Sequence, residues 1–142
     1  MSSSDNEDLV QAALEARSRA HCPYSNFQVG AALRTKSGKV VTGSNIENAA
    51  YPLSTCAERV AITKCVSSLE NKDDKKIVAI AVATKLDDQF PSPCGGCRQI
   101  IAEFGWDSNC QVILVKASGA TTTTSIQELL PKAFLPDVLI KE

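Results

Sequence analysis

Residues 77–83 have the sequence Ile-Val-Ala-Ile-Ala-Val-Ala, and this apolar stretch decides the fold. It is rich in β-branched residues, and a polar loop over 85–91 follows it. A short, uninterrupted apolar run is typical of a strand buried on both faces, so we predict a strand over 77–84. Because both faces of such a strand need cover, we expect helices on both sides of its sheet.

Hydrophobic spacing and turn residues predict the elements on either side of this strand. Near the start, apolar residues recur at helical spacing, and Ser4 and Glu7 are placed as a capping box. After the central strand, Ser92 lies where a helix N-cap is expected and Gly105 lies just past the helix end. In chain order, we predict helices over 5–20, 55–69, 93–104 and 126–130, and strands over 27–34, 39–45, 77–84, 111–116 and 121–125.

This order predicts a single α/β domain over residues 1–142, with a mixed five-stranded sheet between two layers of helices (α/β/α). The chain has 15 Lys+Arg against 16 Asp+Glu, so no positive field attracts nucleic acid or an anionic membrane. No apolar run approaches the roughly 20 residues that span a bilayer, and the acidic start lacks a secretory signal. We therefore expect a cytoplasmic protein, with nuclear access left open, that binds neither membranes nor nucleic acid.

Three of the six cysteines lie at predicted helix N-termini. Cys94 and Cys97 are three residues apart, so both thiols can hold one ion from the first turn of a helix. Cys56 adds a third thiol if both helices begin at the same edge of the sheet. Three thiolates on Zn²⁺ leave one tetrahedral position open, as in catalytic zinc sites. Helix N-termini and Arg59 would offset the negative charge of the thiolates.

Each of these residues also has a simpler interpretation. Cys94-Gly-Gly-Cys97 at a helix start fits a redox-active pair. His21, the only histidine, could complete a structural Cys₃His zinc site. Glu58 could be the partner of Thr55 in a capping box. We expect three other cysteines to be unliganded: Cys22, Cys65 and Cys110.

Three segments carry a resemblance to a known family. They are Asn45-Ile-Glu47-Asn-Ala-Ala-Tyr51, Cys56-Ala-Glu58-Arg59 and Pro93-Cys94-Gly-Gly-Cys97-Arg-Gln99. Together they resemble the small, homotetrameric, zinc-dependent cytidine deaminases, and the resemblance in order and spacing runs from about Ala12 to Phe134. A cysteine at position 56, where the wider class of zinc deaminases has a histidine, is similar to the branch that acts on free nucleosides.

The resemblance implies a metal centre and a proton carrier. Cys56, Cys94 and Cys97 would hold one Zn²⁺ per chain, which would activate water for attack on C4 of the pyrimidine. Glu58 would carry a proton to N3 and then to the departing amino group. Cytidine would thus yield uridine and ammonia.

The resemblance also implies how a nucleoside is bound. Phe27 would stack on the base, and the N–H of Ala57 would bind the base carbonyl. Asn45 and Glu47 would bind the ribose 3′-hydroxyl. Two aromatic residues complete the implied substrate-binding set of a homotetramer with shared active sites, Tyr51 and Phe134, and Phe134 would reach a neighbouring subunit's site. By pattern alone, these residues would be ordinary core, loop or interface residues.

Three functions of different classes follow. The first is a hydrolase acting on free cytidine and deoxycytidine in pyrimidine salvage. The second is a polynucleotide cytosine deaminase, which the composition disfavours because acids dilute the densest basic stretch, residues 72–76. The third is a zinc or redox module without enzymatic activity.

Overall fold

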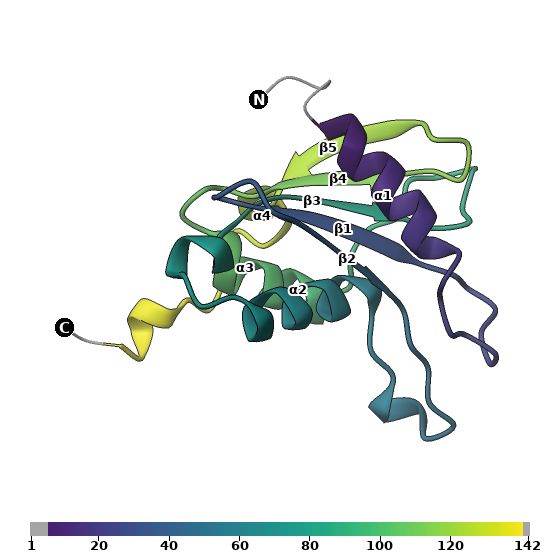
Figure 1. The fold of residues 1–142 in the computed structure, drawn as a ribbon, viewed down its shortest axis with the longest axis horizontal. Helices are drawn as coiled ribbons and strands as arrows, with labels where there is room; N and C mark the ends of the chain where they lie inside the picture. The colour runs from purple at the N-terminus through teal and green to yellow at the C-terminus, as the bar shows by residue number, and fades with distance from the viewer. Residues whose placement is uncertain (1–5, 141–142) are drawn as a thin grey trace.

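The computed structural model describes residues 6–140, in which five strands form one mixed sheet in the order β2-β1-β3-β4-β5 (Figure 1). Strands β3 and β4 pair in parallel, whereas the other neighbouring strands are antiparallel. The strands are β1 (Gly30–Thr35), β2 (Val40–Ser44), β3 (Ile77–Ala83), β4 (Gln111–Val115) and β5 (Thr121–Ser125). The predicted mixed five-stranded sheet is confirmed, and residues 77–83 form its central strand.

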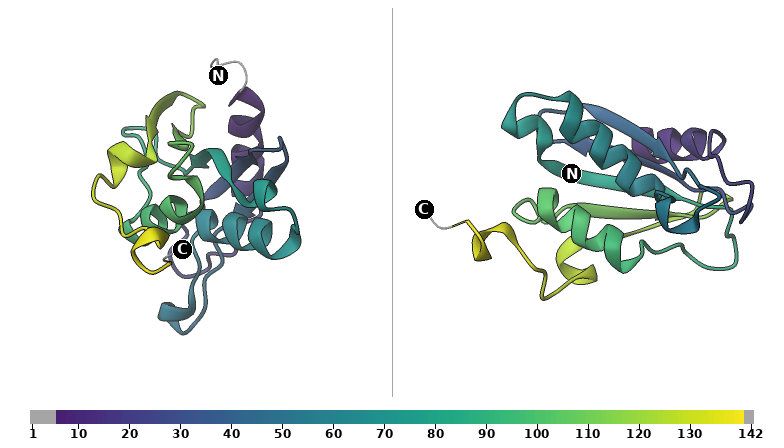
Figure 2. Two further views of the ribbon diagram at one scale, coloured as in Figure 1. Left: turned by 90° about the vertical axis from the view of Figure 1, so that its left-hand side faces the viewer. Right: turned by 90° about the horizontal axis from the view of Figure 1, so that it is seen from below.

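Helices cover both faces of this sheet (Figures 1 and 2). Helix α1 (Glu7–Arg17) lies on one face, and α2 (Ala57–Ser68) and α3 (Gly95–Gly105) lie side by side on the other. The short elements are α4 (Ile126–Leu129) and the 3₁₀ turns η2 (Tyr51–Leu53), η3 (Lys72–Lys75) and η4 (Pro136–Val138). The three-layer prediction is therefore confirmed. None of the helices within residues 6–140 is long and apolar enough to cross a membrane.

The two faces of β3 carry side chains of different size. Ala79, Ala81 and Ala83 pack in one cluster with Leu9 of α1. Ile80 belongs to the other cluster, beneath α2 and α3. Small side chains let a single helix lie close to the sheet, and branched ones fill the wider space under two helices.

Gly43 allows β2 and α2 to approach closely. A Cβ atom at this glycine would lie 2.6 Å from the carbonyl oxygen of Ala57 and 2.5 Å from the amide nitrogen of Ala61. Any side chain would therefore push the helix away from the strand. The glycine thus fixes the N-terminal half of α2 against the sheet.

Two predicted helix starts are wrong. Helix α3 is capped by Cys94 rather than Ser92, because the sulfur of Cys94 accepts the N–H of Cys97 at 3.4 Å. Helix α2 has Cys56 at its N-cap and no side-chain capping bond, so the capping box of Thr55 and Glu58 does not form. Thr55 is extended instead, because its backbone pairs with Ile46.

The first helix also differs from its prediction. Helix α1 ends at Arg17, earlier than the predicted end at residue 20, and its N-cap Asn6 makes no side-chain capping bond. Ser4, the other half of the predicted capping box, lies outside the described residues.

Candidate functional site

A cavity of about 380 Å³ opens where the N-termini of α2 and α3 meet the carboxyl end of β3. Val82 and Thr84 contribute the end of the strand, and the two helix starts contribute thiols and a carboxyl group. Ligands of α/β proteins bind at this edge of the sheet. The predicted residues that line the cavity are Phe27, Asn45, Glu47, Cys56, Ala57, Glu58 and Cys94.

The three predicted ligand thiols converge. The sulfur atoms of Cys56, Cys94 and Cys97 all lie within 4.8 Å of one another. Tetrahedral zinc with Zn–S bonds of about 2.3 Å would place its sulfurs about 3.8 Å apart, so a small contraction brings these thiols into range. Within residues 6–140, His21 does not join the group, so this cluster would offer a zinc ion three sulfur ligands and no histidine. A structural Cys₃His site is therefore contradicted.

The protonation of these thiols is uneven. A hydrogen bond from the Cys97 thiol, aided by the positive charge of Arg59, lowers the pKa of Cys56 to about 6. The same hydrogen bond, together with burial, raises the pKa of Cys97. Arg59 is held in place because its Nη2 donates to the Ser54 carbonyl at 3.1 Å. A deprotonated Cys56 beside a guanidinium is the form that binds metal.

Glu58 is the second residue of α2 and lies in the wall of the cavity beside the thiols. It is only 5% exposed. Burial raises the pKa of its carboxyl group, and the nearby Cys56 raises it further. A carboxyl group in this position is the kind of group that general acid–base catalysis uses.

Three donors hold the carboxylate of Glu47 across the cavity. The Ser25 hydroxyl donates to Oε2 at 2.5 Å, and the backbone N–H groups of Ser25 and Tyr24 donate to Oε1 at 3.1 and 3.2 Å. These bonds, chiefly that from the Ser25 hydroxyl, lower the pKa of Glu47. The ionised carboxylate can only accept hydrogen bonds, so its remaining lone pairs suit a ligand hydroxyl group.

Ser25 is a site residue that the sequence motifs do not indicate. Its hydroxyl also accepts the N–H of Phe27 at 3.0 Å, so one side chain positions both Glu47 and Phe27. A serine in a turn, two residues before an aromatic residue, was the available signal, because serine hydroxyls bond locally in turns. Its contact with Glu47 spans 22 residues and has no local signature.

Asn45 holds the segment that carries Phe27. Its Oδ1 accepts the N–H of Val29 at 2.9 Å, and its Nδ2 donates to the Phe27 carbonyl at 2.8 Å. Phe27 therefore precedes β1 as a loop residue on the cavity wall, and the predicted strand start at residue 27 is wrong. Ala57 is the first residue of α2, where backbone N–H groups lack intrahelical partners and are free for a ligand.

The two predicted aromatic contacts lie outside the cavity of this chain. Tyr51 and Phe134 are 68% and 56% exposed, and neither is among the residues that line the cavity. Phe134 is anchored near α3, because its carbonyl accepts a bond from Gln99 at 2.7 Å. The ring of Tyr51 lies 5.6 Å from that of Tyr24. Within one chain these two aromatics do not complete the site.

Comparisons with known proteins agree with this geometry. The family described as the cytidine and deoxycytidylate deaminase zinc-binding region matches residues 3–114. A probable cytidine deaminase of Dictyostelium discoideum is 44% identical over 140 residues, which cover 99% of this chain and 90% of that protein. A cytidine deaminase of Halalkalibacterium halodurans is 45% identical over 130 residues, 92% of this chain and 94% of the relative.

A solved structure is similar over the same extent. The crystal structure of cytidine deaminase from Burkholderia pseudomallei has a TM-score of 0.79 and 40% sequence identity to this chain. The superposition covers 94% of this chain and all of that one (100%). The similarity thus extends over almost the whole described fold.

Proposed function

Since this chain belongs to the cytidine deaminase family, we propose that it hydrolyses free cytidine and deoxycytidine to uridine and deoxyuridine as a step of pyrimidine salvage. It is a zinc-dependent hydrolase with one zinc site per chain, formed by Cys56, Cys94 and Cys97. The observation that carries the proposal is the convergence of these thiols beside a cavity that Cys56, Cys94 and the buried Glu58 line.

The charge of the cavity favours a nucleoside over a nucleotide. Its lining includes the carboxyl groups of Glu47 and Glu58 but no lysine or arginine. Lys85 lies near the Phe27 ring, 5.8 Å from its centroid, but its ammonium donates to the Asn26 carbonyl at 3.1 Å. A phosphate group would meet negative charge without a partner, and polynucleotides need several basic contacts. We therefore favour a neutral substrate over CMP or single-stranded DNA.

The residues of the cavity divide the chemistry between them. Zinc, when bound, supplies the Lewis acidity that makes water a nucleophile near neutral pH. The Glu58 carboxylate takes a proton from the water and delivers it to N3 as oxygen adds to C4. It then moves the remaining hydroxyl proton to the exocyclic amino group, so that the C4–N bond breaks and ammonia leaves. Water supplies the oxygen of the product, and Glu58 ends in its starting form.

Binding groups orient the substrate for this attack. The Phe27 ring would stack on the base, and the N–H of Ala57 would donate to the base carbonyl oxygen. Glu47 would accept the ribose 3′-hydroxyl, and Asn45 would support both the sugar and the loop of Phe27. Fixed donors and acceptors of this kind lower the barrier by holding the reacting atoms in place.

Ammonia release from four substrates, assayed in parallel, tests the proposal. We expect ammonia from cytidine and deoxycytidine, and none from CMP or a single-stranded oligonucleotide containing cytosine. Elemental analysis should find about one zinc per chain. Comparable ammonia release from the oligonucleotide would overturn the nucleoside assignment, and zinc without ammonia from any substrate would leave a non-enzymatic zinc module.

A further inference from the structure

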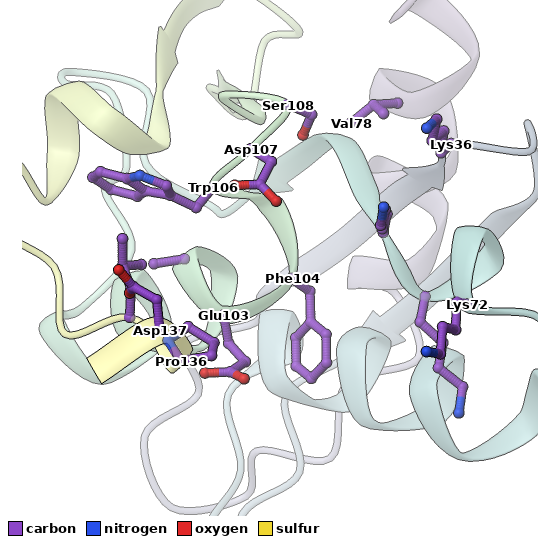
Figure 3. Close-up of a pocket in the computed structure, with 14 residues that line it drawn as sticks. Lys36, Lys72, Val78, Glu103, Phe104, Trp106, Asp107, Ser108, Pro136 and Asp137 are labelled. Carbon is purple, nitrogen blue, oxygen red and sulfur yellow. The ribbon is translucent and has the colours of Figure 1, made fainter. Parts of the chain in front are cut away.

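A second and larger cavity, of about 800 Å³, lies away from the thiols (Figure 3). It is formed by η3, the start of β3, the C-terminal end of α3 and the segment at η4. Helix α3 separates the two cavities: Cys97 lies in its first turn, and Trp106 follows its last residue. At a rise of about 1.5 Å per residue, these positions are roughly 13 Å apart. We call this second site the lysine cavity.

Basic and acidic side chains lie on opposite sides of the lysine cavity. In Figure 3 the labelled Lys36 and Lys72 lie to the right of the Phe104 ring, and Glu103 and Asp137 lie to its left. Asp107, a third acid, and Trp106 also lie to the left of Phe104 in this view, so Phe104 is the aromatic side chain between the lysines and the acids. The cavity therefore has a basic side and an acidic side that also holds Trp106, with the Phe104 ring between them.

The lysines on the basic side are not neutralised by a paired carboxylate within residues 6–140. In a 3₁₀ helix, side chains three residues apart eclipse, so Lys72 and Lys75 project from the same side of η3. Lys36 adds a third ammonium group to the cavity. In the part of the chain that the structure describes, none of these three lysines forms an ion pair.

The acids within η3 are engaged elsewhere. Asp74 is buried, and it accepts hydrogen bonds from the Ser37 hydroxyl and, at 3.2 Å, from the Lys39 ammonium. Asp73 pairs with Lys76 at 3.8 Å. Neither acid therefore neutralises the ammonium groups that face the cavity, and mutual repulsion there is relieved by binding an anion.

We propose that the lysine cavity binds a nucleoside 5′-phosphate. Lys36, Lys72 and Lys75 would hold the phosphate, which lysine binds as a point charge. The sugar joins the phosphate to the base, so the sugar hydroxyl groups would donate hydrogen bonds to the acids, and the base, farthest from the lysines, would lie against Trp106. The volume is that of a small-molecule site. An inorganic anion alone would leave the acidic side and its tryptophan without a ligand.

The only tryptophan of the chain provides a direct probe, because Trp106 lines this cavity and no other tryptophan contributes to the signal. The zinc-loaded full chain is titrated with UMP while saturating uridine fills the cavity at the thiols. Uridine alone and inorganic phosphate are titrated separately. We expect a saturable change of tryptophan fluorescence with UMP, none with uridine and a much weaker response with phosphate.

Two double variants complete the test. Lys72→Gln/Lys75→Gln should weaken UMP binding about tenfold, which is the sum of two exposed charge contacts. Lys64→Gln/Lys132→Gln makes the same change of charge outside the cavity and should bind UMP as the wild type does. Lys36→Gln, on a different segment, gives an independent check if the first variant fails to fold.

Three results would overturn the proposal. They are no saturable response to UMP, equal weakening by both double variants, or phosphate binding as tightly as UMP, which would leave a simple anion site. The fluorescence signal does not depend on turnover, so failure of this proposal and failure of the proposed deamination are separate outcomes.

Discussion

At the scale of single residues, Glu58 shows most clearly how function overrides stability. The carboxyl group of Glu58 is only 5% exposed, so its ionisation destabilises the fold. It makes no capping bond that would offset this free energy. The fold therefore has no need of a charge at this position. Proton transfer to the pyrimidine does need one, so the carboxyl group is explained by chemistry rather than by folding.

Glu58→Gln separates these two roles. An amide of the same shape removes a buried ionisable group, so the melting temperature and zinc content should stay at or above the wild-type values. Loss of a general acid and base typically slows a reaction about 10²–10⁴-fold, and Glu58 serves several proton transfers, so we expect the upper end or beyond. Melting, zinc content and ammonia release should be measured on one sample. Retention of more than about a tenth of the wild-type turnover, a difference of only about 1.4 kcal/mol, would contradict the catalytic role.

The thiol of Cys56 should be the reactive one when zinc is removed. Its pKa of about 6 makes it a thiolate at pH 7, whereas burial raises the pKa of Cys110 to about 12 and that of Cys97 is also raised. We expect iodoacetamide to label Cys56 before Cys97 and Cys110 in the chelator-treated protein. The labelling rate of Cys56 should fall as the pH drops through about 6. Peptide mapping by mass spectrometry measures this, with the zinc-loaded protein as the protected control; a midpoint near that of an ordinary thiol would refute it.

Ser25 should act through Glu47. Ser25→Ala removes the hydroxyl that holds the carboxylate, so Glu47 loses its orientation and its pKa rises. Loss of one hydrogen bond to a charged group should raise KM for cytidine by about tenfold with little change in kcat. Cytidine lacking the 3′-hydroxyl should be insensitive to the variant, and Ser67→Ala on exposed α2 is the control. An equal rise of KM for both nucleosides would show a general distortion instead.

At the scale of elements, the site depends on where two helices begin. The N-terminus of α2 is placed by its contact with β2 at Gly43, and that of α3 by the connection from the end of β3. Because β3 and β4 are parallel, the chain must cross over between them, and α3 is that crossover. Both helices therefore begin at the edge where β3 ends, and their free N–H groups favour the thiolates there.

Gly43→Ala should disturb the metal site from a distance. The added methyl group would overlap the backbone of α2, and overpacking of this kind costs about 1–3 kcal/mol of unfolding free energy. Zinc affinity should fall as well, because Cys56 is the N-cap of the displaced helix. Gly38→Ala is the control: its positive φ of 96° strains the new residue, but nothing lies within 4 Å. Zinc titration and thermal melting distinguish the two variants. If both variants lowered zinc affinity equally, displacement of α2 would not be the cause.

At the scale of the whole molecule, large apolar side chains are exposed on two projecting segments. One is the loop around η2, and the other is the C-terminal segment, which extends away from the sheet (Figure 1). The most exposed members are Tyr51, Leu53, Phe134, Val138, Leu139 and Ile140. Patches of this kind indicate contact surfaces, which supports the homotetramer that the family resemblance implies.

Phe134→Ala tests whether a neighbouring subunit completes the site. We expect KM for cytidine to rise while zinc content holds, because Phe134 does not line the cavity of its own chain. Light scattering should give a mass four times that of the chain for the wild type. A strictly monomeric preparation with full activity would exclude shared active sites. Val40→Ala, at another exposed apolar position, is the matched control.

Several features were determined by the sequence itself because their physical causes are local. The run over 77–83 had to be a strand with both faces covered, since its length and branched residues fit no other element. The spacing of Cys94 and Cys97 placed two thiols within one helical turn, and thiol chemistry indicated zinc. Cys56 could join Cys94 and Cys97 only if both helices began at the same edge of the sheet. The sequence could name this condition but could not show that it was met.

The tertiary structure decided what depends on contacts between distant segments. The hydrogen bond between Ser25 and Glu47 joins segments 22 residues apart, and Phe134 lies outside the cavity of its own chain. The tertiary structure also gathered lysines, aromatics and acids from four segments into the lysine cavity. Local spacing carries no information on such contacts, because they exist only once the sheet has brought the segments together.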